Sequence, residues 1–439
     1  MTINRRKFVA AGLSALAGSG LYQPAQASAM TPQDVIHAWY GLSLELVRHT
    51  PTYSPPVASR AFAYLGITAY EAVAGGAGAL RSLAGQLNGL TPLPQRVPGL
   101  ATGEAAVLHA ALTAAATDLF ANTGPTGQRA LSRLGEKLSA AVSAGLTAEI
   151  VTRSAAHGRA VAAHILAWSR SDGGAVIENL GFPASYQLSH GPAHWMPANL
   201  IALQQTPLLP DWGHNRSFAM PDGAACPLPA PPAYSEDEAS AFYRQALEVV
   251  EIQKNLSLEQ RAIARFWSDD PMLSPTPPGH WESIALQSLK RNDASLEQSV
   301  DVLARLGVAL ADAFIACWNA KYQYDLLRPV TYIRRVIDPQ WQSLIATPPF
   351  PDYPSGHSTQ SGAAAVVLAE AFGETYAFVD ATHRKDVLAP RAFKSFWAAA
   401  EEAGISRLYG GIHFRAAIER GLDQGRCVGG FANALRTRV

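Results

Sequence analysis

Residues 348–357 read PPFPDYPSGH, and this stretch organises the C-terminal half of the 439-residue chain. Proline fixes φ and lacks a backbone N–H, so the prolines keep the approach extended. Ser355 and Gly356 stand where a helix would begin, and His357 opens the first turn of the run that ends at Gly373. A helix N-terminus offers unpaired N–H groups and a partial positive charge, so we expect an anion site with a histidine beside it.

Two further stretches supply cations and a second histidine. KYQYDLLRP begins at Lys321 and contains Arg328, seven residues on, which is about two helical turns. We therefore expect both side chains on one face of a helix. SRLYGGIH places Arg407 before a Gly-Gly break and His413 after it. Charge neutralisation, fixed donors and two histidines together are what a tetrahedral oxyanion requires.

The three motifs resemble the vanadium-dependent haloperoxidase / type-2 phosphatidic acid phosphatase superfamily. They read Lys-x6-Arg-Pro, then Pro-Ser-Gly-His, then Ser-Arg-x5-His, in that order. Each motif is weak alone, and the conjunction carries the resemblance. It is firm from about residue 267 to residue 430 and thin before that.

The resemblance implies a role for each residue around bound vanadate, in a site that phosphate can also occupy. His413 would bond the vanadium through a ring nitrogen, and His357 would act as acid and base across from it. Lys321 would also assist catalysis. The vanadate oxygens would be held by Lys321, Arg328, Ser355, Gly356 and Arg407. The implied substrates are hydrogen peroxide and a halide; the organic acceptor and the oligomeric state stay open.

Two aromatic residues refine the subclass. Phe350 lies seven residues before His357, and Trp318 lies three before Lys321. In chloroperoxidase-like members of the family, aromatic residues occupy these places in the substrate pocket. An apolar wall desolvates the oxidant, so the pair favours a chloride-competent pocket, although core packing would explain either aromatic equally well.

Two alternatives use the same pocket. In a soluble exported acid phosphatase, His413 would attack phosphorus and His357 would protonate the leaving alcohol. A non-enzymatic oxyanion-binding protein would need no acid/base histidine. Many relatives carry an aspartate four residues after the second histidine, where this chain has Ala417. Its absence disfavours the phosphatase and leaves open what orients the His413 ring, a backbone carbonyl being one candidate.

Composition bears mainly on partners and redox state. A formal net charge of zero, from 35 basic and 35 acidic residues, gives no argument for nucleic acid or an anionic membrane surface. Cys226, Cys317 and Cys427 allow at most one disulfide, and we expect buried free thiols.

His190 and His194 have no convincing third metal ligand nearby, so we expect structural or surface roles for them.

The first 29 residues resemble a twin-arginine export signal. RRKF at 5–8 precedes an apolar, small-residue stretch, and AQA at 25–27 is a candidate cleavage site. The apolar stretch is too short for an ordinary membrane helix, and no other segment reaches that length. We therefore expect a bacterial protein exported by this route to the periplasm or the medium, with no membrane insertion of the mature chain.

Helical patterning without a competing strand pattern predicts an all-α protein of two packed helical bundles. An N-terminal helical region at 30–234 would end in a Pro/Gly-rich excursion at about 171–234, and a catalytic bundle would occupy 235–439. Such long loops are often lids or straps over a site. The predicted helices cover residues 34–49, 59–73, 102–120, 126–143, 147–169, 257–267, 281–289, 296–320, 357–372, 391–403 and 412–435.

Overall fold

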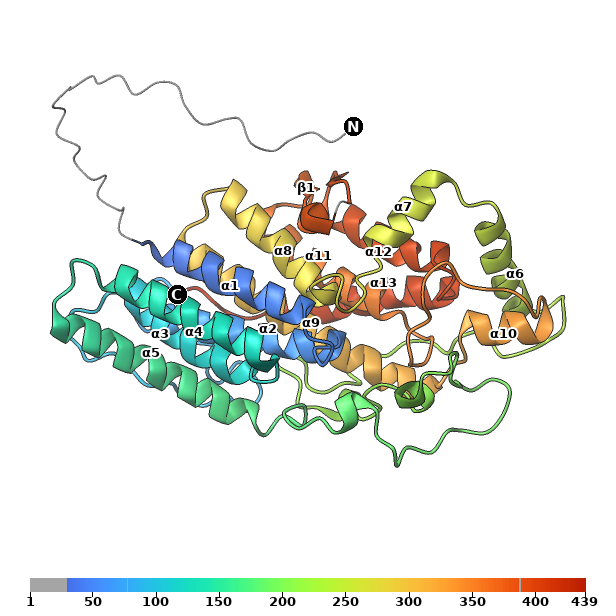
Figure 1. The fold of residues 1–439 in the computed structure, drawn as a ribbon, viewed down its shortest axis with the longest axis horizontal. Coiled ribbons are helices and arrows are strands. Elements are labelled where there is room, and N and C mark those ends of the chain that lie inside the picture. Colours follow the sequence, from blue (N-terminus) through green and yellow to red (C-terminus); the bar gives the residue numbers. More distant parts are fainter. Residues whose placement is uncertain (1–29, 77, 387) are drawn as a thin grey trace, which may run out of the picture.

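A computed structural model describes residues 30–76, 78–386 and 388–439, so the predicted export signal lies outside the described residues. The fold is helical, as predicted, and elongated (Figure 1). The N-terminal half contains α1 (Pro32–Arg48), α2 (Pro55–Ala74), α3 (Glu104–Leu119), α4 (Gly124–Ser143) and α5 (Ala148–Ser169). The C-terminal half contains α6 (Ala241–Lys254), α7 (Leu258–Phe266), α8 (Thr276–Arg291), α9 (Leu296–Tyr324), α10 (Pro329–Val336), α11 (Gly356–Phe372), α12 (Phe396–Tyr409) and α13 (Arg415–Asn433). No helix within these described ranges has the length and apolar character of a membrane span.

Helix α9 forms the centre of the molecule. Of its 29 residues 22 are buried, because its sequence is apolar on most sides rather than along one stripe. It packs along α2 on one side and against α11 and α13 on the other. A Cβ on Gly66 of α2 would lie only 2.8 Å from the carbonyl oxygen of Leu303, so glycine permits the close crossing. The two halves of the chain therefore share one core.

Helix α13 presents a row of glycines to α11. A Cβ on Gly425 would overlap the carbonyl oxygen of Thr359, and one on Gly421 would lie 2.8 Å from that of Ser355. The Ser355 N–H donates to the carbonyl oxygen of Ala417 at 2.9 Å. The row thus brings α13 against the N-terminal end of α11, where the predicted site begins.

Residues 171–234, here called the strap, run as irregular chain from the end of α5 to α6 (Figure 1). The strap contains three short 3-10 turns, η1 (Asn179–Gly181), η2 (Ala202–Gln205) and η3 (Trp212–His214). The Asp312 carboxylate of α9 accepts the N–H groups of Phe218, Ala219 and Met220 at 2.7, 2.8 and 3.0 Å. A disulfide between Cys226 and Cys427 ties the strap to α13.

Three predictions about local structure were wrong. The predicted helix at 391–403 begins instead with a strand, β2 (Arg391–Phe393), which pairs antiparallel with β1 (Phe378–Asp380). Helix α12 starts only after Ser395, whose hydroxyl accepts the Ala398 N–H at 3.0 Å. The chain between 324 and 356 contains a helix, α10, that was not predicted. Two of the three cysteines are bonded rather than free, and Cys317 alone is a buried thiol.

Candidate oxyanion site

Helix α11 begins where the sequence predicted an anion-binding helix end. Ser355 is its N-cap residue, with the hydroxyl accepting the Ser358 N–H at 3.4 Å, and Gly356 is the first helical residue. Both Ser355 and Gly356 are buried. The first N–H groups of a helix have no partner within it, so α11 offers a buried, electropositive end.

The prediction that Lys321 and Arg328 share a helix face is wrong. Helix α9 ends before Asp325, which adopts a left-handed conformation, φ 44° and ψ 39°, and turns the chain. Arg328 is instead the N-cap residue of α10, which starts at Pro329. Both cations are still completely buried, and both act electrostatically on His413. A turn rather than a helix face brings them together.

Three backbone carbonyls hold the Lys321 ammonium group. Nζ donates to the oxygens of Pro351, Asp352 and Pro354 at 2.7, 3.1 and 2.6 Å. Burial, with the charge of Arg328 acting in the same direction, lowers the pKa of Lys321 to about 7. Because an ammonium group has three donors, Lys321 can contact an anion directly only by exchanging one of these bonds.

Arg328 keeps one donor group without a protein partner. Nε donates to the carbonyl oxygen of Phe350 at 2.7 Å, and Nη1 donates to that of Ile412 at 2.8 Å. Nη1 also lies 3.1 Å from Nε2 of His413. Nη2 is buried and has no hydrogen-bond partner among the described residues. Such a donor costs free energy when unpaired, and an anion that accepts from it removes the cost.

Arg407 supplies the third cation from the last turn of α12. Its Nη2 donates to the carbonyl oxygen of Trp267 at 2.6 Å, and its Nε to the hydroxyl of Ser406 at 3.0 Å. Burial lowers the pKa of Arg407 to about 10, so the group stays charged at neutral pH. Burying several cations is expensive unless counter-charge lies nearby. Asp269 and Asp270 supply part of it at Arg407, and a multiply charged oxyanion would supply more.

His413 lies in the turn between α12 and α13, because α13 begins at Arg415 and not at the predicted residue 412. Burial first, then the charges of Arg328 and Lys321, hold the pKa of the His413 ring well below its usual range. The ring is therefore neutral and has a lone pair for a metal. Its Nδ1 lies 2.9 Å from Oδ1 of Asp352, at ion-pair distance.

Asp352 is a site residue to which the sequence analysis gave no role. Its carboxylate is fully buried and also lies 3.8 Å from Nη1 of Arg328. Burial raises the pKa of Asp352 to about 7, against the opposing charges of Arg328 and Lys321. Neither carboxylate oxygen has a hydrogen-bond partner among the described residues. A proton on Nδ1 directed at Oδ1 would orient the ring and leave Nε2, which lies 3.1 Å from Nη1 of Arg328, for a ligand. The sequence did contain one signal for Asp352, since it is an acidic residue among prolines and aromatic residues. A buried acidic residue nearly always has a partner, so a role in the site could have been predicted.

His357 lies in the first turn of α11, directly after Gly356. Its Nε2 is buried without a hydrogen-bond partner among the described residues, and Oδ2 of Asp269 lies 3.9 Å away. Burial, followed by the charge of Arg407, holds the pKa of His357 well below its usual range. A neutral ring with an unpaired nitrogen can accept a proton from a bound ligand.

Trp318 and Phe350 form an aromatic wall beside the cations. Their ring centroids lie 4.9 Å apart. Nζ of Lys321 lies 5.1 Å from the Phe350 centroid, and Cζ of Arg328 lies 4.8 Å from it. Trp318 donates its indole N–H to the carbonyl oxygen of Leu208, at 3.1 Å, so the strap covers this wall. The arrangement excludes water from one side of the cations.

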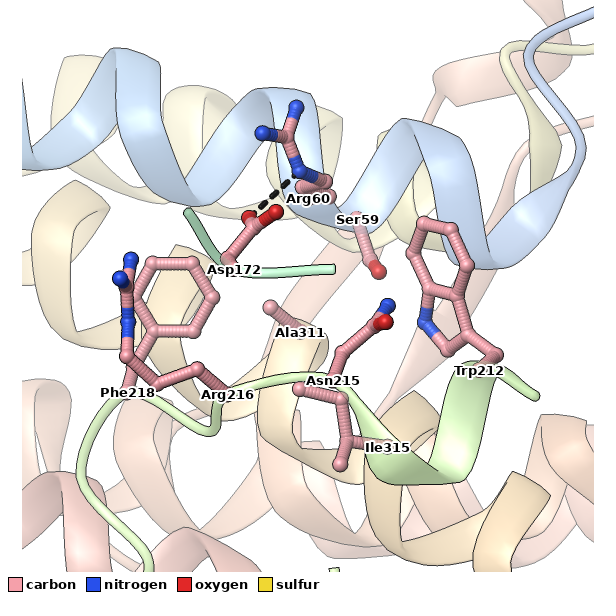
Figure 2. A pocket seen from close by; sticks show the side chains of 9 residues that line it. All are labelled: Ser59, Arg60, Asp172, Trp212, Asn215, Arg216, Phe218, Ala311 and Ile315. Atoms are coloured by element: carbon pink, nitrogen blue, oxygen red, sulfur yellow. Dashed lines mark hydrogen bonds and ion pairs between the residues drawn. The ribbon is translucent and has the colours of Figure 1, made fainter. Parts of the chain in front are cut away.

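The pocket in Figure 2 is a different feature, between α2, α9 and the strap. There Arg60 and Asp172 point toward each other, and Nε of Arg60 donates to Oδ2 of Asp172 at 2.6 Å. The guanidinium also donates to the carbonyl oxygen of Ser169 at 2.7 Å. Arg216, the second cation that lines this pocket, donates through Nη2 to the hydroxyl of Tyr64 at 2.9 Å and to the carbonyl oxygen of Trp168 at 3.0 Å, so protein groups already hold both guanidinium groups. This pocket anchors the start of the strap to α2.

Comparisons with known proteins point to one family. The model of the VCPO second helical-bundle domain matches residues 301–339 and 335–439. The crystal structure of the first bacterial vanadium-dependent iodoperoxidase has a TM-score of 0.85 at 37% identity, covering 92% of this chain and 97% of that one. The holo-type bacterial vanadium-dependent chloroperoxidase has a TM-score of 0.67 at 16% identity, over 92% of each chain, which shows the fold. Vanadium chloroperoxidase from Curvularia inaequalis is 30% identical over 129 residues, and that match spans 24% of this chain and only 21% of the curated relative.

Proposed function

The chain belongs to the vanadium-dependent haloperoxidase family, and on that premise we propose that it binds vanadate at the α11 N-terminus and uses hydrogen peroxide to oxidise halide to hypohalous acid. One observation carries the proposal. A neutral, buried His413 meets three buried cations, of which Arg328 has an unpaired Nη2 donor. An imidazole lone pair suits the metal, and charge-assisted donors suit the oxygens.

Each residue has a defined task in this proposal. Bound vanadate supplies an electrophilic metal centre at which hydrogen peroxide becomes reactive toward halide. His413 would hold the metal through Nε2, with Asp352 fixing the ring from Nδ1. The donors to the oxygens would be Lys321, Arg328, Ser355, Gly356 and Arg407. Packing and carbonyl bonds fix Arg328 and Arg407 in advance, whereas Lys321 would first exchange one of its three carbonyl bonds.

His357 would move the proton. Its ring is neutral and its Nε2 is unpaired, so the nitrogen can take a proton from hydrogen peroxide as the peroxide binds. The same nitrogen would return that proton to the peroxide oxygen that leaves as water, and one further proton from solvent completes the hypohalous acid. Lys321, in the proposed site, withdraws charge from the reacting oxygen through its own positive charge.

Iodide is the halide we assign first. The relative that is 37% identical to this chain is an iodoperoxidase, and iodide is the most easily oxidised of chloride, bromide and iodide. The Trp318–Phe350 wall instead favours a chloride-competent pocket, because it limits access of water to the oxidant. The chloride preference stays a prediction that the assay below decides.

Export by the twin-arginine route, to the periplasm or the medium, is the proposed localisation. The arginine pair and the apolar stretch of the first 29 residues support it. The Cys226–Cys427 disulfide adds support, since such bonds persist mainly in oxidising compartments.

The test is a halogenation assay. Purified protein is loaded with vanadate, freed of excess, and given hydrogen peroxide with iodide, bromide or chloride and a diketone reporter. We expect vanadate-dependent halogenation, fastest with iodide, which His413→Ala abolishes together with vanadium retention. Glu419→Gln, a change at an exposed site on α13, should leave both intact.

A parallel arm separates the alternatives. Vanadate-free protein is given an aryl phosphate. Phosphate release that vanadate inhibits, with no halide oxidation, would show that the pocket is right and the reaction is a phosphatase. Anion binding without either turnover would show an oxyanion-binding protein.

A further inference from the structure

Behind His357 lies a second cluster of buried ionisable side chains, formed by three separate segments. Asp269 follows α7, His280 belongs to α8, and His383 belongs to the 3-10 segment η4 (Thr382–Asp386) after β1. All three side chains are buried, with at most 4% exposed. One ligand atom from each lies within 4.8 Å of the other two. No residue of this cluster belongs to the oxyanion site.

We propose that Asp269, His280 and His383 bind one divalent transition-metal ion, for which Zn²⁺ is the best match to two imidazoles and a carboxylate. Zinc binds imidazole nitrogen and carboxylate oxygen at ~2.0–2.2 Å, so neighbouring ligand atoms of a tetrahedral site lie ~3.3 Å apart. Here Nδ1 of His280 lies 3.0 Å, and Nε2 of His383 lies 3.4 Å, from Oδ1 of Asp269. Both separations suit ligands that share an ion.

In each histidine, the ring nitrogen that does not face Asp269 lies beside a second carboxylate, which belongs to Asp380 or Asp386. Nε2 of His280 lies 2.7 Å from Oδ2 of Asp380, and Nδ1 of His383 lies 3.1 Å from Oδ2 of Asp386. Asp380 is itself fixed, because its Oδ1 accepts the Thr382 N–H at 2.9 Å. Carboxylates in this position orient the rings of metal-binding histidines and raise their basicity. The inner nitrogens are thereby aimed at Asp269.

A buried, unpartnered atom independently points to a ligand. Nε2 of His383 has no hydrogen-bond partner among the described residues, although it faces Asp269. A metal ion would accept its lone pair and satisfy it. Aromatic rings close the cluster, with Trp267 stacked on His280 at 4.5 Å and Phe266 edge-on to His383 at 5.0 Å.

A proton on His280 is the competing occupant. Burial alone would lower the pKa of this ring, but the charges of Asp269 and Asp380 outweigh it and raise the pKa to about 10. A buried imidazolium would therefore also balance these carboxylates, without any metal. A metal ion would also satisfy Nε2 of His383, which lies 3.4 Å from Oδ1 of Asp269, and direct metal analysis distinguishes the two occupants.

An ion here would act on the oxyanion site through the α7–α8 turn. Trp267, two residues before Asp269, accepts the hydrogen bond from Arg407 through its carbonyl oxygen. Asp269 also lies 3.9 Å from His357. The metal would fix this turn and thereby position both residues, without touching the substrate.

The experiment measures Zn²⁺ binding to the purified protein after chelator treatment, by calorimetry and elemental analysis. We expect one equivalent to bind at sub-micromolar concentration. His383→Gln should abolish this binding, and Asp386→Asn should weaken it ~10–100-fold, as loss of an outer carboxylate does. A cobalt-substituted sample should show visible absorption bands that His383→Gln lacks. Circular dichroism checks that each variant folds.

Two control variants distinguish Zn²⁺ binding at this cluster from Zn²⁺ binding at other histidines. His49 is exposed, and its Nε2 lies 3.5 Å from a carboxylate oxygen of Glu45, so this surface pair can bind metal adventitiously. The variant His49→Gln should still bind one equivalent of Zn²⁺ tightly. His413→Ala should also retain it, so loss of the proposed vanadate site does not affect the result. The proposal would be overturned if the parent protein bound no Zn²⁺ at sub-micromolar concentration, or if His383→Gln still bound one equivalent of Zn²⁺ that tightly.

Discussion

Asp352 is the acidic side chain beside the His413 ring, with Oδ1 2.9 Å from Nδ1. We predict that Asp352→Asn lowers vanadate affinity ~10–100-fold, because the neutral amide loses the charge that orients Nδ1 and supports ligand basicity. The measurement is the vanadate concentration that gives half-maximal halogenation. Asp423→Asn, at an exposed carboxylate of α13, is the matched control. Equal affinity in both variants would show that other contacts hold the ring.

Glu71 gives a pH-dependent prediction. Its buried carboxylate accepts the Leu83 N–H at 2.6 Å, and burial raises the pKa of Glu71 from 4.5 to about 7. The folded protein therefore binds this proton more tightly than the unfolded chain, and the stabilisation is lost as pH rises from about 4.5 to 7. Over that window the free energy of unfolding of wild type relative to Glu71→Gln should fall by ~3 kcal/mol. Denaturant unfolding at pH 4.5, 6 and 8 measures it, and a constant difference would contradict the assigned shift.

Residues with local sequence signatures could be predicted, and residues defined by distant partners could not. The structure brings Ser355, Gly356 and His357 together at a helix start because capping chemistry is local. Asp352 acquires a role only from His413, far along the chain. His280 and Asp380 meet across 100 residues, so no spacing rule indicates their contact.

At the level of elements, the contact between α11 and α13 offers a sharp test. A Cβ at Gly425 would overlap the carbonyl oxygen of Thr359, so Gly425→Ala must push the helices apart. We predict a loss of ~1–3 kcal/mol in the free energy of unfolding, typical of overpacking. Halogenation should fall as well, since α13 also holds the backbone of Ser355.

The control for that change lies on the same helix. Gly430 is exposed, and nothing lies within 4 Å of a Cβ built there. Gly430→Ala should stabilise the protein by ~0.5–1 kcal/mol, because alanine loses less backbone entropy in a helix. Denaturant unfolding measures both variants. Equal changes would mean that the close helix contact contributes nothing.

Long helices were predictable from periodicity, and the breaks between them were not. Asp325 turns the chain in a left-handed conformation that no pattern around it indicates. The strands β1 and β2 have three residues each, too few to show an alternation. Tertiary packing decides such short elements.

For the whole molecule, the disulfide between the strap and α13 is the main covalent constraint. It joins residues 201 positions apart, and closing a long loop restricts the unfolded chain most. We predict that changing Cys226 and Cys427 together to alanine lowers the free energy of unfolding by ~2–5 kcal/mol. Reductant should destabilise wild type by a similar amount and leave the double variant unchanged. Identical unfolding of oxidised and reduced wild type would contradict this.

The all-α architecture followed from the sequence, but the shared core did not. Periodicity places apolar faces on helices without saying which helices meet. The crossing of α2 and α9 depends on Gly66 opposite Leu303, residues from different halves of the chain. Only the folded arrangement reveals that the largest core is shared by both halves, while a smaller cluster around Phe242 and Tyr332 belongs to the C-terminal half alone.

The same disulfide makes a covalent ring of the chain from Cys226 to Cys427, and every predicted oxyanion residue lies within that ring. A protease would find exposed targets there, such as Met272 and Leu273, which are 47% and 64% exposed. One nick would open the ring without releasing a fragment, because the two pieces stay joined through sulfur. The cut protein should run as one band without reductant and as two with it, and it should keep its halogenating activity until the bond is reduced.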